Sequence, residues 1–326
     1  MSEAQDERPA ASVALGEQHG TTSVGHGTER RLGWARRGGP AGANRAIRRA
    51  AWLFSVPAIL TYGIFGWYPV ILAFVVAFQK FAIRGEAQWV GLQNFVRALH
   101  DPLVPLALRN SFYYTLLVVV FTFWVPIIVS IFVLEMEPRI QRWMTILWFI
   151  PVSGTAGIVI WKFFYNPYYG LFNGILTSVG LPALRWLDDA NLTMFLLVLP
   201  GLITYGPGLI YLATLQAVPV ELYEAAELDG AGFFTKVRAI TFPTLWPIIS
   251  VLLVLTTIGS VQMFSQAYVM TGGGPENSTF TIVMYIFRQA FSYLDFGYAD
   301  ALSLILFVML MVLVILQLRL QASQNN

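Results

Sequence analysis

The sequence predicts an all-α, polytopic membrane protein, and three observations lead to that prediction. Hydrophobic residues make up 56% of the 326 residues and charged residues only 12%, whereas a soluble domain carries roughly a quarter charged residues. Long apolar stretches recur along the chain, and each reaches the about 20 residues that a helix needs to cross a bilayer. Ionisable side chains are missing from the middle of these stretches, as expected where lipid is the solvent.

The first predicted element is a polar N-terminal tail over residues 1–49. It is rich in Gly, Ala, Ser, Arg and Glu without apolar periodicity, which predicts a disordered cytoplasmic segment. It does not resemble a secretory signal, because the apolar stretch begins only at Ala50 and no small-residue cleavage site follows. The membrane domain is expected over 50–320, and a short cytoplasmic tail over 321–326.

Six apolar stretches are the expected membrane spans. They are Trp52–Phe78, Phe112–Leu134, Trp143–Phe164, Leu192–Leu215, Leu245–Met270 and Tyr298–Leu318. Prolines interrupt several of them, but neighbouring helices can satisfy the freed backbone groups in a membrane, so we expect kinks and not helix ends. These prolines include Pro57, Pro69, Pro126, Pro151, Pro200 and Pro207.

The placement of Lys and Arg predicts the orientation. An N-terminus inside the cell puts the Arg-rich tail in the cytoplasm together with Arg139, Arg142, Lys236 and Arg238, in agreement with the positive-inside rule. Six spans then place both termini inside, and the loop after the fourth span also faces the cytoplasm.

Two outer segments have recognisable patterns. Apolar residues follow helical spacing over 170–179, so this segment is expected to lie flat at the outer membrane interface. They are Leu171, Phe172, Ile175, Leu176 and Val179. The run Gly272-Gly273-Gly274-Pro275 predicts a tight turn that ends the fifth span.

The sequence lacks the residues for its own ATP hydrolysis. Its lysines are Lys80, Lys162 and Lys236, and none follows a glycine, so no Walker A loop is present. No Cys occurs, which excludes disulfides and thiolate ligands. We therefore expect no cofactor or metal on this chain, and ATP hydrolysis by a partner.

Other classes of membrane protein are less consistent with the sequence. The acid pairs Glu135/Glu137 and Asp188/Asp189 lie in loops and are better explained as solvated charges than as the site of a membrane-embedded enzyme. A proton-driven carrier normally has acids or His within its spans, and none lies in the middle of a span here, although a sodium-driven secondary carrier remains an alternative. The Arg cluster lies only before the first span, so no nucleic-acid partner is expected.

A polar island of about 25 residues separates the fourth and fifth apolar stretches. Pro219 and Pro243 bracket it. Residues 220–228 favour a helix whose glutamates at 221, 224 and 227 share one face, Gly230 permits a sharp reversal, and a second short helix is expected from about Phe233 to Ala239. The predicted result is a helix–turn–helix knob; the alternative is an ordinary interfacial loop with solvated acids.

Glu224-Ala225-Ala226, followed by Gly230, Ile240 and Pro243, resembles the EAA loop of membrane subunits of binding-protein-dependent ABC importers. In that family the loop is a cytoplasmic coupling helix that seats in a groove of the ATPase subunit. The resemblance implies that Glu224 pairs with a basic residue of the ATPase and that the two alanines allow close approach. The bend would lie at Asp229 and Gly230, with Glu221 on the same coupling surface, and Val237 stands where the family usually has Phe.

Four further segments are similar to carbohydrate-type permeases of the maltose and glycerol-3-phosphate group. They are Trp89-Val-Gly-Leu-Gln-Asn-Phe95, Leu215-Gln-Ala-Val-Pro219, Thr271-Gly-Gly-Gly-Pro275 and Phe296-Gly-Tyr-Ala-Asp-Ala301. With the EAA loop they extend the resemblance over about 52–320. It implies the type I permease fold of ABC importers.

Polar or small residues near the middle of spans are candidates for the substrate pathway. They are Ser153, Thr155, Thr204, Tyr205, Thr256, Gly259, Ser260 and Gln262. The alternative is that these residues serve helix–helix packing, for which Ser, Thr and Gly are common in membranes.

The resemblance implies a translocation subunit for a sugar, oligosaccharide or sugar-like solute in the bacterial cytoplasmic membrane. Its implied partners are a second homologous permease subunit, two copies of an ABC ATPase that bind ATP and Mg, an extracytoplasmic solute-binding protein, and membrane lipid. The EAA loop would couple ATPase closure to alternating access. An ion-gradient-driven secondary carrier is the alternative function, and it leaves the EAA loop unexplained.

Overall fold

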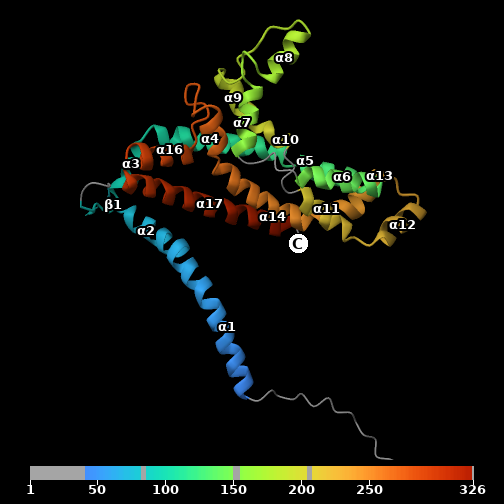
Figure 1. Ribbon diagram of the computed structural model, residues 1–326, viewed down its shortest axis with the longest axis horizontal. Coiled ribbons are helices and arrows are strands. Elements are labelled where there is room, and N and C mark those ends of the chain that lie inside the picture. Colours follow the sequence, from blue (N-terminus) through green and yellow to red (C-terminus); the bar gives the residue numbers. More distant parts are fainter. Residues whose placement is uncertain (1–40, 82–85, 150–154, 204–207, 325–326) are drawn as a thin grey trace, which may run out of the picture. The chain divides into compact units, whose positions relative to one another are not determined.

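The computed structural model describes residues 41–81, 86–149, 155–203 and 208–324, which are mostly helical (Figure 1). The chain divides into two compact units, Met1–Leu60 and Thr61–Asn326. The described part of the first unit belongs to α1 (Ala41–Tyr62), whose residues 48–60 are exposed. This helix begins before the predicted end of the tail at residue 49; its first turns contain several Ala and Arg residues, which are strong helix formers.

The second unit is built from helices and one short hairpin. Its strands β1 (Gln79–Lys80) and β2 (Gln88–Trp89) pair antiparallel, with Gln79 opposite Trp89. Its helices are α2 (Tyr68–Val76), α3 (Gln93–His100), α4 (Leu103–Leu117), α5 (Val125–Leu134), α6 (Pro138–Phe149), α7 (Thr155–Phe164), α8 (Leu171–Ser178), α9 (Ala190–Val198), α10 (Pro200–Ile203), α11 (Gly208–Gln216), α12 (Val220–Leu228), α13 (Phe233–Lys236), α14 (Phe242–Val261), α15 (Ser265–Met270), α16 (Ile282–Phe287) and α17 (Phe296–Gln324), with π-helical turns at Gly63–Trp67, Val118–Thr122, Val237–Thr241 and Arg288–Ser292.

Five helical stretches among the described residues are long and apolar enough to cross a membrane. They are Arg48–Val76, Leu103–Leu134, Ala190–Gln216, Phe233–Met270 and Phe296–Gln321. The predicted span Trp143–Phe164 corresponds to α6 and α7, and residues 150–154 between them lie outside the described residues. A six-span count and the positions of the termini therefore stay predictions.

Three prolines lie in the first turn of a helix without ending the helical run. Pro69, Pro126 and Pro243 each follow a π-helical turn by a few residues and stand in the first turn of the next helix. Proline has no N–H for the carbonyl four residues earlier and collides with it. The wider π turn absorbs this mismatch, so the helical run continues.

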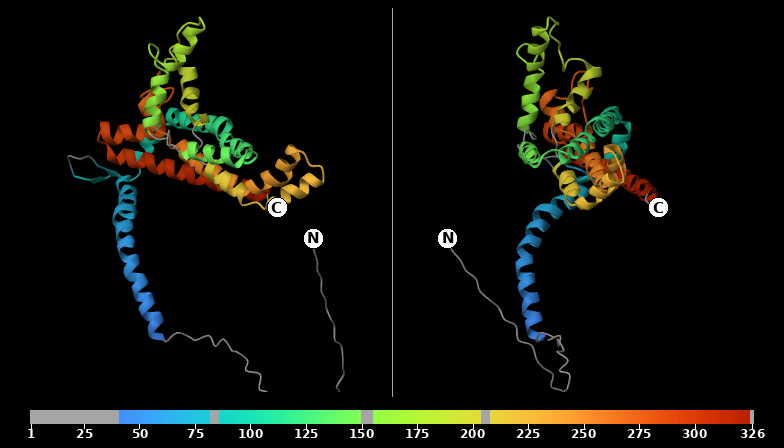
Figure 2. Two further views of the ribbon diagram at one scale, coloured as in Figure 1. Left: turned by 45° about the vertical axis from the view of Figure 1, so that its right-hand side comes forward. Right: turned by 90° about the vertical axis from the view of Figure 1, so that its right-hand side faces the viewer.

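The long helix α17 organises the second unit. It packs against α2, α3, α14 and α16 (Figures 1 and 2). The larger apolar core includes Tyr298 and Leu302 of this helix together with Phe280. A second core joins α5, α11 and α14 through Ile127, Leu215 and Leu245. Leu215 and Leu245 flank the polar island, so this second core packs directly beneath the predicted coupling loop.

The predicted outer segment 170–179 is helical as α8. Phe172 and Leu176 are half-buried, whereas Leu171, Ile175 and Val179 are exposed. The apolar residues that were expected to share one membrane-facing surface therefore lie on two sides of the helix, one packed against the protein and one exposed. The division follows from a cluster of aromatic rings that encloses Phe172, formed by Trp161, Phe164, Tyr165 and Trp186.

Candidate coupling loop and substrate pathway

The polar island folds as a helix–turn–helix knob. Pro219 precedes α12, and Asp229 ends it. Gly230 then adopts a left-handed backbone with φ of 81°, a conformation that favours glycine. The N–H of Ala231 donates to the carbonyl of Ala226 at 2.9 Å and closes the helix end. The chain reverses at the position where the sequence places the bend.

The second limb of the knob differs from the prediction. It was expected to end near Ala239, with Pro243 closing the loop, and this is wrong. The helix runs from Phe233 through the π turn into α14, and Pro243 is the second residue of that long helix. A proline is tolerated in the first turn of a helix, and the N–H of Phe242 bonds the carbonyl of Val237 across the wider turn. The knob is therefore continuous with the fifth apolar stretch.

Two side-chain contacts hold the limbs of the knob together. The Tyr223 hydroxyl and the Thr241 Oγ1 are 3.1 Å apart at its base. Nearer the bend, the Lys236 ammonium donates to Glu227 Oε1 at 2.7 Å. These contacts join α12 to the start of the fifth stretch, so the two limbs are tied at both ends.

The knob also packs against the end of α5. The rings of Phe132 and Phe233 stack with centroids 5.9 Å apart and planes 19° from parallel. The turn from α5 to α6 is itself closed by Gln141, whose Nε2 donates to the carbonyls of Leu134 at 2.8 Å and Met136 at 2.9 Å. The second apolar stretch thus ends against the knob.

The predicted coupling residues lie mostly at the surface. Glu221, Glu224, Ala225, Asp229, Gly230 and Pro243 are exposed, and Ala226 and Ile240 are half-buried. Sequence reasoning missed two large apolar residues beside them, Leu228 and Phe234, which are 90% and 84% exposed. Their presence in an otherwise polar loop was the signal available, since exposed large apolar side chains often mark a contact with another protein.

Half of the predicted pathway residues have side chains outside the part of the chain that the structure describes. Ser153, Thr204 and Tyr205 lie outside the described residues, and Thr155 begins α7 but its side chain is likewise undescribed.

The other four pathway candidates do not share one environment. Ser260 is buried and its Oγ donates to the Thr257 carbonyl at 3.2 Å, as expected of a packing residue. Thr256 is half-buried, whereas Gly259 and Gln262 are exposed. A side-chain carbon added at Gly259 would meet no atom within 4 Å, so this side of α14 is open in the isolated chain.

The expected single span Leu245–Met270 is broken. Helix α14 ends at Val261, and α15 begins at Ser265. The Thr281 Oγ1 donates to the carbonyl of Met263 in the gap at 2.9 Å, which satisfies a backbone group that the break has released. Breaks of this kind in membrane helices place polar backbone beside a cavity or a bound solute.

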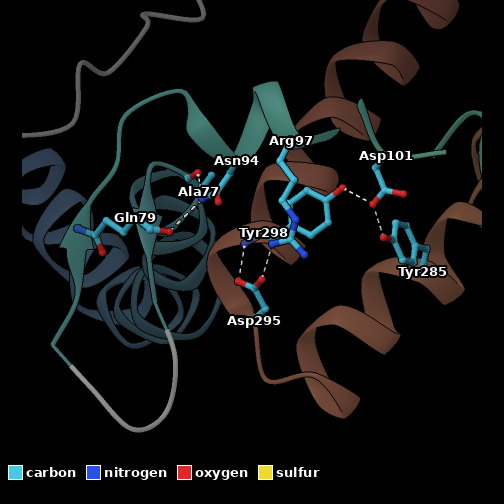
Figure 3. A network of polar contacts seen from close by, with 8 residues as sticks. All are labelled: Ala77, Gln79, Asn94, Arg97, Asp101, Tyr285, Asp295 and Tyr298. Carbon is cyan, nitrogen blue, oxygen red and sulfur yellow. Dashed lines mark hydrogen bonds and ion pairs between the residues drawn. The ribbon is translucent and has the colours of Figure 1, made fainter. Parts of the chain in front are cut away.

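The segment Trp89–Phe95 has a structural role at the hairpin. The Asn94 Nδ2 donates to the carbonyls of Ala77 at 2.9 Å and Gln79 at 3.0 Å (Figure 3). Trp89 stacks on Phe78 with ring centroids 5.8 Å apart. The motif therefore fastens the chain that leaves α2 to the start of α3.

A polar network joins α3 to the start of α17. Arg97 pairs with Asp295 at 2.7 Å and lies over the Tyr298 ring, 3.8 Å from its centroid. Asp101 accepts hydrogen bonds from the hydroxyls of Tyr298, at 2.8 Å, and Tyr285 (Figure 3). Residues almost 200 positions apart in the sequence are thereby held at one place.

Glycine is required at one position of this junction. A side-chain carbon at Gly297 would lie 2.0 Å from the carbonyl oxygen of Gln79, closer than atoms can approach. The segment Phe296–Ala301 therefore lets α17 contact β1 directly.

The glycine-rich turn after α15 is anchored by side chains. Gly272 and Gly273 have φ of 64° and 96°. The Thr279 Oγ1 donates to the Gly274 carbonyl at 2.9 Å, and the Asn110 Nδ2 of α4 donates to the carbonyl of Asn277 at 2.7 Å. The turn is thus a tight structural connection, as the sequence predicts.

Comparison with known proteins decides the family. The chain is 33% identical over 282 residues to the arabinooligosaccharides transport system permease protein AraP of Bacillus subtilis (strain 168), over 85% of this chain and 90% of that protein. The chain belongs to the carbohydrate-type permeases of ABC transporters. It is 31% identical over 284 residues to the trehalose/maltose transport system permease protein MalF of Thermococcus litoralis, over 83% of this chain and 93% of that one. No family model matches the chain.

Solved structures show the same fold. A bacterial ABC transporter involved in the import of the acidic polysaccharide alginate has a chain that superimposes with a TM-score of 0.74, at 23% identity, over 87% of this permease and all of that chain. A second structure, of an alginate ABC transporter in complex with an alginate pentasaccharide-bound periplasmic protein, has a TM-score of 0.71 at 24% identity, over 84% of this permease and 94% of that chain. The permease is therefore an all-α, multi-pass protein of the cytoplasmic membrane and a subunit of an ABC importer, not an ion-gradient-driven carrier.

Proposed function

We propose that the permease moves a sugar, oligosaccharide or sugar-like solute across the membrane, and that the knob 219–243 is its coupling loop to an ATPase. The observation that carries this proposal is the unbroken helical run from Phe233 into α14. A force applied to the knob reaches the fifth apolar stretch through a helix and not through a flexible linker.

The exposed surface of the knob suits an ATPase groove. It combines the carboxylate of Glu224 with the small Ala225 and the apolar side chains of Leu228 and Phe234. Apolar residues surrounded by charge are typical of the centre of a protein interface. Glu224 would pair with a basic ATPase residue while the two apolar side chains enter the groove.

The proposed mechanism is alternating access driven by partner subunits. ATP binding closes two ATPase subunits, the knob moves with them, and the pathway opens outward to a loaded solute-binding protein; hydrolysis resets it inward. ATP can shift this equilibrium only by favouring one conformation over the other. The permease supplies no Walker A loop, so ATP and Mg would be bound by the ATPase, and the permease would hold no cofactor of its own.

The break between α14 and α15 is the proposed place of solute contact. Gln262 and Gly259 are exposed there beside the half-buried Thr256, and amide and hydroxyl groups form hydrogen bonds with sugar hydroxyls. Ser260 is assigned to packing instead, because it is buried. A second homologous permease would cover this open side and complete the pathway.

ATP-dependent uptake by the reconstituted complex tests the coupling role. Radiolabelled maltose, trehalose and arabinooligosaccharides serve as solutes for wild type, Glu224→Ala and Gly230→Pro; proline cannot adopt the φ of 81° found at Gly230. We expect both variants to enter the membrane and to lose uptake together with solute-stimulated ATP hydrolysis. Unchanged uptake in both would reject the loop as the coupling element.

A further inference from the structure

Most of the Lys236 side chain is covered, although it lies in a loop that projects from the second unit. Its side chain is 11% exposed, whereas that of its partner Glu227 is 60% exposed. A loop lysine that serves only solubility extends its ammonium group into water. A lysine side chain that lies along the protein instead of extending into water is held by acidic or carbonyl partners.

One carboxylate pairs with Lys236 directly, and a second lines the same groove. Glu227 of α12 accepts the 2.7 Å hydrogen bond. Glu135, in the turn between α5 and α6, lines the same groove as Lys236, and its charge also acts on the ammonium group. Lys236 itself belongs to α13, which continues into α14. Lys236 therefore pairs with α12 and faces the same groove as the turn between α5 and α6.

We propose that Lys236 is a positioning residue that joins the coupling loop to the turn between α5 and α6. Displacement of α12 then reaches the second apolar stretch, which ends at Leu134, as well as the fifth. This inference rests on the proposed coupling function of the loop.

The geometry favours a role in orientation over a role in folding. An ion pair with one well exposed partner adds little to stability. The stacked rings of Phe132 and Phe233 already supply apolar packing at the same junction. The Lys236–Glu227 pair adds a fixed orientation to that packing, because it holds α12 beside the groove that Glu135 lines.

Distances between spin labels test the proposal in the full complex with its ATPase. The chain has no Cys, so the pair Leu222→Cys and Arg139→Cys, at exposed positions of α12 and α6, reports the orientation of the knob. The background variants are Lys236→Met, Lys236→Arg and Glu227→Gln. Arg319→Met is the control, since Arg319 is exposed at the far end of α17 and forms no ion pair with any described residue.

Distance distributions are recorded without nucleotide and after trapping with MgATP and vanadate. We expect a narrow distribution that shifts on trapping in wild type, Lys236→Arg and Arg319→Met. Lys236→Met should assemble with the ATPase but show a broad distribution without the shift. If Lys236→Met does not assemble, Glu227→Gln is judged by the same criterion.

Two results would contradict different parts of the account. A Lys236→Met complex that keeps both the narrow distribution and the shift overturns the positioning role while leaving the coupling loop intact. A wild-type complex whose distance does not respond to trapping instead overturns the proposed coupling function.

Discussion

Single residues at the junction of α3 and α17 show how one carboxylate can organise distant parts of the chain. Asp101 accepts hydrogen bonds from the hydroxyls of Tyr285 and Tyr298 and, through Oδ1, from the N–H of Leu103 at 2.9 Å. Burial alone would raise the pKa of the Asp101 carboxyl. The three hydrogen bonds and the nearby charge of Arg97 outweigh burial and lower this pKa below its ordinary value of 3.8.

Replacing Asp101 with Asn is expected to destabilise the permease by about 1–3 kcal/mol, because a charged acceptor for two hydroxyls is lost. A lowered pKa in the folded state means that the carboxylate contributes stability above the ordinary pKa, and that this contribution is lost as the pH falls through the lowered value. Thermal unfolding in detergent should show the full difference between wild type and Asp101→Asn near pH 7. A difference that persists undiminished well below pH 3.8 would contradict the assignment to the charge.

At the scale of an element, α8 and the segment that follows it depend on one buried amide. The Asn173 Nδ2 donates to the carbonyls of Pro167 at 3.0 Å and Leu184 at 2.8 Å. Its Oδ1 accepts from the N–H of Leu184 at 3.0 Å and from Trp186 Nε1 at 2.9 Å. All the hydrogen-bonding positions of this side chain are thus used to close the loop 166–186.

Asn173→Ala should therefore loosen this segment while the rest of the second unit stays folded. The substitution leaves buried donors and acceptors unpaired, at about 1–3 kcal/mol for each such group. Amide hydrogen exchange over 166–189 should accelerate in Asn173→Ala, with little change over α17. The control is Thr177→Ala, one turn further along α8, whose hydroxyl bonds only carbonyls of its own helix. Equal exchange in Asn173→Ala and wild type would reject the role of Asn173.

At the scale of the whole molecule, the predicted topology puts Tyr168 and Leu222 on opposite sides of the membrane. Both positions are exposed, and one apolar stretch, Ala190–Gln216, lies between them. Single-cysteine variants Tyr168→Cys and Leu222→Cys can be made without further changes because the chain has no Cys.

A membrane-impermeant maleimide should label Tyr168→Cys in intact cells, and Leu222→Cys only after permeabilisation. Ser2→Cys should behave like Leu222→Cys if the N-terminus is inside. Labelling of Leu222→Cys from outside would overturn the cytoplasmic location of the coupling loop and with it the proposed function.

Local patterns in the sequence were sufficient for the membrane class, the family resemblance and the bend at Gly230. Apolar stretches of sufficient length have few alternatives to a membrane helix. A left-handed turn between two helix-forming segments favours glycine, whatever the tertiary structure around it. The same reasoning could not foresee that the helix continues past Pro243, because a π turn replaces the expected helix end.

The sequence by itself therefore determined that this protein lies in a membrane, that it is all-α and that it bends at Gly230, since each depends on neighbouring residues. Tertiary structure alone decided the pairing of Lys236 with Glu227, the network at Asp101 and the buried position of Ser260. It also showed why the segments Trp89–Phe95 and Phe296–Ala301 have their residues: Asn94 and Gly297 both meet the backbone of Gln79. Contacts between residues about 200 positions apart depend on how helices pack, and no local pattern encodes that packing.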